Sequence, residues 1–125
     1  MEQKVCLDTD ICIEVIKNTE IGRKTVDAIA KYPIFITTIT AFELYTRKTS
    51  IDKIDLFLNK VDVLDFDIRC AKAASKVYNS LKDGGMLIEF RDIFIAATCI
   101  ENKCSLATLN KKHFERIKGL EILDI

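Results

Sequence analysis

The chain has 125 residues, in which 19 lysines and arginines balance 19 aspartates and glutamates. This length fits one domain, 1–125, and about half of the residues are apolar, which is enough for a single core. A net charge of zero argues against a protein that holds nucleic acid by bulk charge, although it leaves room for local patches. A charged fraction of 30% without a run of like charges excludes a disordered chain.

The five cysteines indicate a reducing compartment. Their number is odd, no CxxC pair occurs, and most lie in apolar stretches, so we expect buried thiols in a cytoplasmic protein. A zinc site is not expected, because the chain has one histidine and irregular cysteine spacing. The run IFIAATCI is too short to span a membrane, and we expect no membrane contact.

Short apolar strands alternate with amphipathic helices along the chain. We predict strands at 5–7, 34–36, 61–64, 105–108 and 120–123, and helices at 9–17, 22–31, 40–48, 51–59, 67–82 and 87–101, with a helical turn at 111–114. This alternation predicts an α/β fold with a mostly parallel sheet of four or five strands and helices on both faces. In such folds the ligand site lies beyond the carboxyl ends of the strands, so we expect the functional residues there.

Two acidic positions have an ordinary structural explanation. Asp8 follows the first strand, and either Asp8, Thr9 or Asp10 caps the next helix, or Asp8 presents a carboxylate at the sheet edge. Glu43 follows Thr40 by three residues, and we interpret the pair as a capping box.

Asp92 calls for a functional explanation, because almost wholly apolar residues follow it in its helix. A buried carboxylate needs a cation, hydrogen-bond donors or a metal, and the adjacent Arg91 points about 100° away. A position in the first helical turn is the alternative. If the topology brings Asp8, Glu43 and Asp92 together, their repulsion requires a cation, and oxygen ligands favour Mg²⁺ or Mn²⁺.

Four segments together resemble the PIN-domain ribonucleases, and more narrowly the toxins of VapBC toxin–antitoxin systems. The segments are LDTDICIEVIK, ITAFELY, the stretch from Gly85 through IFIAATCI, and TLNKKHF. The resemblance implies a PIN-like fold and metal-dependent endonucleolytic cleavage of RNA. It also implies a VapB-like antitoxin as partner and a homodimer.

The resemblance assigns a role to each candidate residue. Asp8, Glu43 and Asp92 would be catalytic and would ligate Mg²⁺ or Mn²⁺, with Thr9, Asn110 and His113 at the rim. His113 stands where the family often has a fourth acid. It would position water, bind a second metal weakly, or mark weakened activity. The RNA-contact candidates are Arg91, Lys111, Lys112 and Arg116, together with Arg47, Lys48 and Lys118.

Two alternatives stay open at this stage. The chain length and the acidic pair after the first strand also fit a phospho-receiver signalling domain, with Asp65 as the acceptor. A PIN-like domain without activity, which only binds RNA or protein, is the second alternative.

Overall fold

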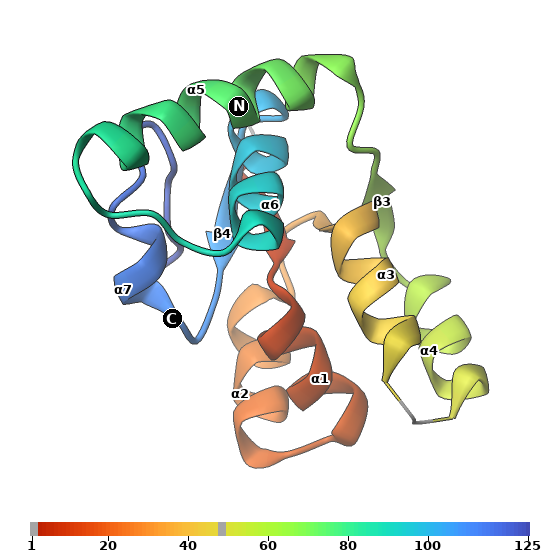
Figure 1. Cartoon of the computed structure of the whole chain (residues 1–125). Coiled ribbons are helices and arrows are strands. Elements are labelled where there is room, and N and C mark those ends of the chain that lie inside the picture. Colours follow the sequence, from red (N-terminus) through yellow and green to blue (C-terminus); the bar gives the residue numbers. More distant parts are fainter. Residues whose placement is uncertain (1–2, 48–49) are drawn as a thin grey trace.

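Four short strands form one sheet in the computed structural model, which describes residues 3–47 and 50–125 (Figure 1). The strands are β1 (Lys4–Leu7), β2 (Ile34–Thr37), β3 (Asp62–Leu64) and β4 (Cys104–Ala107). They lie in the order β3-β2-β1-β4, and every pairing is parallel. The predicted parallel α/β sheet is confirmed.

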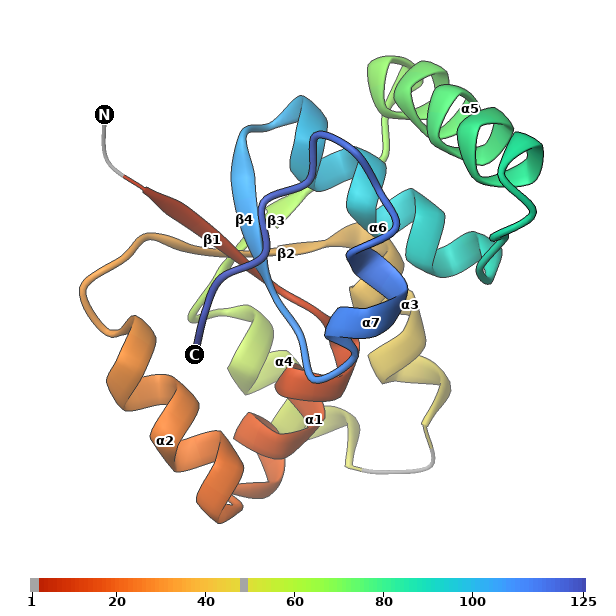
Figure 2. The ribbon, with the colours of Figure 1, turned by 90° about the vertical axis from the view of Figure 1, so that its left-hand side faces the viewer.

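Helices cover both faces of this sheet. They are α1 (Thr9–Lys17), α2 (Glu20–Ile29), α3 (Thr38–Thr46), α4 (Ile51–Leu58), α5 (Ile68–Asp83), α6 (Phe90–Glu101) and the short α7 (Lys111–Phe114). Figure 2 shows α1, α2 and α4 on one side of the sheet and α5 and α6 on the other. No helix in the two described ranges is long and apolar enough to cross a membrane.

Alternating side chains of the central strand divide the core into two clusters. Val5 and Leu7 pack with Ile36 of β2 and with Ile11 and other residues of α1 to α4. Cys6 faces the opposite way and packs with residues of α5, α6 and α7. All five cysteines are buried and free, as the apolar surroundings in the sequence predict.

The predicted last strand is reduced to a single bridge. Ile122 pairs in parallel with Leu106, and Leu106 accepts a 2.8 Å hydrogen bond from the Leu123 backbone N–H. The chain therefore runs beside β4 without extending the sheet by a regular strand.

Three helices begin at other residues than the sequence pattern predicted. The Thr37 side chain, not Thr40, caps α3 by accepting a hydrogen bond from the Thr40 N–H. Thr19 caps α2, which begins before Gly22, and α6 begins at Phe90, three residues after the predicted start. The last shift places Asp92 in the first turn of α6.

Candidate active site

An acidic pocket lies where the order of the strands reverses. The chain runs from β1 outward to β3 and then returns to add β4 on the other side of β1, so the loops after β1 and β4 flank a crevice. This crevice opens into a pocket of about 370 Å³, which we call the acidic pocket. Its lining residues are Asp8, Thr9, Asp10, Ile13, Glu43, Thr46, Arg47, Arg91, Asp92 and Asn110.

Asp8 is both a helix cap and a pocket residue, so the two explanations of its position hold together. Its carboxylate accepts a 2.8 Å bond from the Thr9 N–H and a 2.7 Å bond from the Thr108 hydroxyl. Only 5% of Asp8 is exposed. Burial, reinforced by the nearby Asp10 charge, raises the pKa of Asp8 to about 7 despite these bonds.

Asp10 belongs to the pocket, although the sequence suggested only a helix cap. It accepts backbone hydrogen bonds from Ile11 at 2.7 Å and from Leu109, beyond β4, at 3.2 Å. Burial raises the pKa of Asp10 above its ordinary value. The acid-x-acid pattern directly after a buried strand is the signal that points to Asp10 as well as to Asp8.

Glu43 does not form the predicted capping box, because it lies in the middle of α3, six residues after the true cap. Its Oε1 instead accepts a 2.8 Å hydrogen bond from the Thr9 hydroxyl. Its Oε2 faces the Arg91 guanidinium at 3.8 Å. The cap shift therefore turns Glu43 into a half-buried pocket carboxylate held between two other elements.

Asp92 enters the pocket from the first turn of α6. Burial, together with the charges of Glu89 and Glu43, raises the pKa of Asp92. His113 stands beside it, with 4.0 Å between His113 Nδ1 and Asp92 Oδ2, and the same nitrogen lies 2.8 Å from Asn110 Nδ2. The structure thus brings the predicted rim residues Asn110 and His113 to Asp92.

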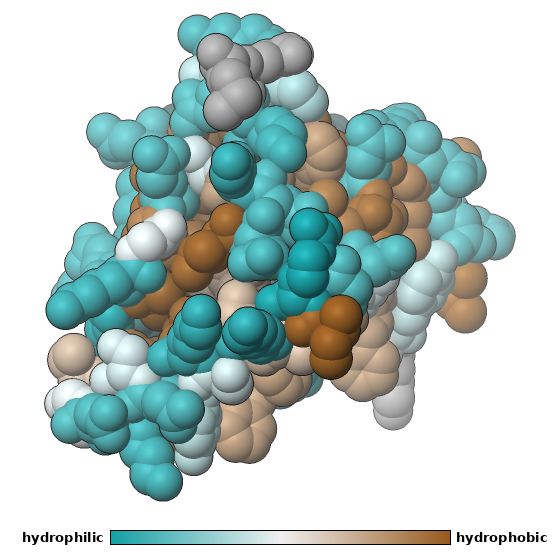
Figure 3. Space-filling model, turned by 90° about the horizontal axis from the view of Figure 1, so that it is seen from above, coloured by the Kyte–Doolittle hydropathy of each residue, from teal (hydrophilic) through white to brown (hydrophobic). Residues whose placement is uncertain are grey.

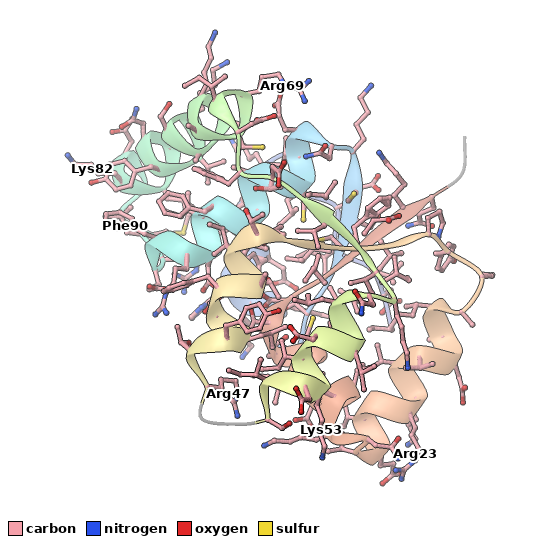
Figure 4. The ribbon with its side chains drawn as sticks, turned by 90° about the vertical axis from the view of Figure 1, so that its right-hand side faces the viewer. Arg23, Arg47, Lys53, Arg69, Lys82 and Phe90 are labelled. Atoms are coloured by element: carbon pink, nitrogen blue, oxygen red, sulfur yellow. The ribbon has the colours of Figure 1, made fainter. Side chains whose placement is uncertain are left out.

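The RNA-contact candidates in the described residues divide among three places. Arg91 and Arg47 line the acidic pocket, and Figure 4 shows Arg47 at the end of α3. Arg91 is held by Glu89 at 2.8 Å, which agrees with its poor direction toward Asp92. Lys111 and Lys112 lie on α7 next to Asn110, whereas Arg116 and Lys118 line a separate hollow; Lys48 lies outside the described residues.

The chemistry of the donors fits a hard divalent cation. Four carboxylates face one pocket. Three of them have raised pKa values, chiefly because burial disfavours their charged forms, and repulsion from neighbouring acids adds to the shift. A cation would relieve that repulsion. In the arrangement seen, no three His, Cys, Asp or Glu side chains of the described ranges are close enough to hold a metal. Both oxygens of Glu43 have other partners, because Oε1 accepts the hydrogen bond from Thr9 and Oε2 faces Arg91.

The phospho-receiver alternative lacks the arrangement that it needs. Its acceptor, Asp65, follows β3, which is an edge strand and pairs with β2. Strand β2 therefore separates Asp65 from Asp8 and Asp10, and Asp65 does not line the acidic pocket.

Comparison with known proteins gives consistent matches over nearly the whole chain. Ribonuclease VapC1 from Methanocaldococcus jannaschii is 32% identical, over 98% of this chain and 89% of the relative. The tRNA(fMet)-specific endonuclease VapC from Shigella flexneri is 28% identical, over 97% of both chains. The crystal structure of VapBC2 from Rickettsia felis, bound to a promoter DNA fragment, superposes with a TM-score of 0.85 at 25% identity, over 98% of this chain and 99% of that chain.

The family model that matches is that of the PIN domain, and it covers residues 5–120. That span includes β2, β3 and β4, all of β1 except Lys4, and every residue that lines the acidic pocket. The chain belongs to the PIN domain family.

Proposed function

We propose that the chain is a metal-dependent endoribonuclease and the toxin of a VapBC-type toxin–antitoxin pair. The convergence of Asp8, Asp10, Glu43 and Asp92 on one pocket carries the proposal. Relatives named as VapC ribonucleases, and a similar chain in a VapBC structure, support the substrate class and the antitoxin partner.

The acids would hold Mg²⁺ or Mn²⁺ in the pocket. When bound, such an ion supplies an acidified water and neutralises charge that develops on the phosphate. Asp8 and Asp92 are the principal proposed ligands, because both line the acidic pocket, Asp8 from the end of β1 and Asp92 from the first turn of α6. Thr108 and Thr9 orient Asp8 and Glu43 by hydrogen bonds. Arg91 and Arg47 supply positive charge for the RNA backbone at the same pocket.

Two further expectations accompany this function. We propose a cytoplasmic location, because five free thiols suit a reducing compartment. The homodimer implied by the family resemblance stays a prediction, which sedimentation of the purified chain can check.

The proposal is tested by RNA cleavage with Mg²⁺ or Mn²⁺ and with excess chelator. We expect cleavage by the wild type with metal, and its loss with chelator and in Asp8→Asn and Asp92→Asn. Asp27→Asn, on the exposed side of α2, is the matched control and should cleave normally. Circular dichroism verifies that each variant is folded. Full cleavage in chelator or by Asp92→Asn would refute the metal mechanism. An inactive wild type that still binds RNA would favour the binding module.

A further inference from the structure

A groove lined by positive side chains runs along α5, away from the acidic pocket. It consists of two adjoining hollows of about 490 and 130 Å³, which share Lys76, Val77 and Lys118 in their linings. We call it the basic groove and define it by its cationic residues, which are Arg69, Lys72, Lys76, Arg116 and Lys118.

The fold assembles this groove from two distant segments. Arg69, Lys72 and Lys76 are spaced by three and four residues and so lie along one side of α5. Arg116 and Lys118 follow α7 and form the facing side. Val77 and Ile100 are the apolar lining between them. Figure 3 looks down on the part of the molecule that carries α5, where hydrophilic side chains border a strip of hydrophobic ones.

The positive charge of the groove is largely uncompensated. Glu101 is the acid in its lining, and Arg69 lies 3.5 Å from Asp67. Within the part of the chain that the structure describes, Lys72, Lys76, Arg116 and Lys118 form no ion pair. An ordinary solvated surface intersperses charges of both signs, whereas this groove gathers five cations around one acid. Like charges around a hollow instead favour an anionic ligand.

Helix α6 connects the basic groove to the acidic pocket. Asp92, in its first turn, lines the acidic pocket, and Glu101, at its last residue, lines the basic groove. Nine residues of helix rise by about 14 Å. One polyanion that reaches both sites must therefore carry phosphates over at least this length. On one strand of a duplex this is about four nucleotide steps, and so about five successive phosphates, which is more than a tetranucleotide carries.

We propose that the basic groove binds the phosphate backbone of the RNA substrate several nucleotides from the scissile bond. The inference rests on the proposed function, because the acidic pocket is taken as the cleavage site. It narrows the substrate to an RNA long or folded enough to lie across both sites. Recognition in the groove is of backbone charge, because contacts to phosphates carry no direct sequence information.

The test measures RNA binding by fluorescence anisotropy in the Asp92→Asn background, with Mn²⁺. The salt concentration is varied from roughly 50 to 200 mM, a range over which counterion release changes the affinity measurably. The groove variant is Lys72→Gln/Lys76→Gln/Lys118→Gln. The matched control is Lys17→Gln/Lys24→Gln/Lys31→Gln, which removes the same charge from exposed positions around α1 and α2. The probes are a tRNA-sized transcript, a tetranucleotide and duplex DNA of the transcript's length.

We expect the groove variant to bind the transcript about 10- to 100-fold more weakly, with a salt slope lower by about two. Its affinity for the tetranucleotide should stay unchanged, and the control should bind both RNAs like the parent. Equal losses in the two triple variants, an equal loss for the tetranucleotide, or tighter groove-dependent binding of duplex DNA would each overturn the proposal. Binding is scored without cleavage. A failure of the nuclease assay is thus distinguishable from a failure of the groove.

Discussion

Asp8 shows how one residue can serve structure and chemistry at once. Its cap bond and the Thr108 hydroxyl fix the carboxylate at the floor of the pocket, where it is almost fully buried. Its pKa of about 7 means that the metal-free folded chain binds a proton more tightly than the unfolded chain, whose Asp8 has a pKa near 3.8. The stability that this proton contributes is complete below pH 3.8 and is lost as the pH rises through 7.

We therefore predict that the metal-free chain becomes less stable as the pH rises from roughly 5 to about 7.5, because the Asp8 carboxyl loses its proton over this range. Over this window Asp8 alone accounts for at most ~3 kcal/mol of the loss in the free energy of unfolding, and the raised pKa values of Asp10 and Asp92 act in the same direction. Urea titrations in chelator would measure the change. Asp8→Asn should flatten it, and an equally steep loss in that variant would contradict the assignment.

Arg91 is the side chain that competes most directly with a metal for Glu43. It faces Glu43 Oε2 at 3.8 Å, whereas Arg47 lines the same pocket without an ion pair in the described ranges. We predict that Arg91→Gln binds Mn²⁺ about two- to fivefold more tightly, measured by titration calorimetry, and that Arg47→Gln gains less. The gain from Arg91→Gln should vanish in the Glu43→Gln background. If it persists there, Arg91 acts through general charge alone.

At the scale of elements, the close crossing of α1 and α2 depends on Gly22. A Cβ at this position would lie 2.2 Å from the backbone oxygen of Glu14, and backbone cannot move aside as a flexible side chain can. We predict that Gly22→Ala lowers the free energy of unfolding by about 2 kcal/mol or more. Gly84→Ala is the matched control, because its Cβ would meet Met86 Cε at an ordinary 3.5 Å. It should change stability by less than about 0.5 kcal/mol, and a similar loss in both variants would argue against the crossing as the cause.

Periodicity predicted most elements, because the strands are short apolar runs and the helices are amphipathic. The prediction of the start of α3 was wrong, because two threonines near that start can each act as the N-cap. Thr37 and Thr40 are both good cap residues, and only the exit direction of β2 decides that Thr37 caps α3 and Glu43 faces the pocket. The last strand failed for a similar reason, since Ile122 is apolar but bridges only Leu106. A local sequence pattern does not show which strand a segment pairs with, or over how many residues.

For the molecule as a whole, a net charge of zero conceals two separated regions of opposite sign. Without Asp8, Glu43 and Asp92, 16 acidic side chains remain against 19 basic ones, and part of that excess gathers in the basic groove. The balanced composition leaves room for a cluster of acids, and three of its members could be named from the sequence. The sequence did not indicate the groove, because α5 and the segment after α7 meet only in the fold. RNA should therefore be attracted at the groove and repelled at the metal-free pocket.

The repulsion at the pocket yields the last prediction. In chelator, Asp92→Asn should bind RNA more tightly than the wild type, because one of the half-buried carboxylates that line the acidic pocket loses its charge. Added Mn²⁺ should strengthen binding by the wild type more than by the variant, since the ion neutralises the carboxylates that repel phosphate. A phosphorothioate RNA, which resists cleavage, keeps the measurement at equilibrium. Equal affinities in chelator would mean that phosphate does not approach the acidic pocket, and the basic groove would then account for binding alone.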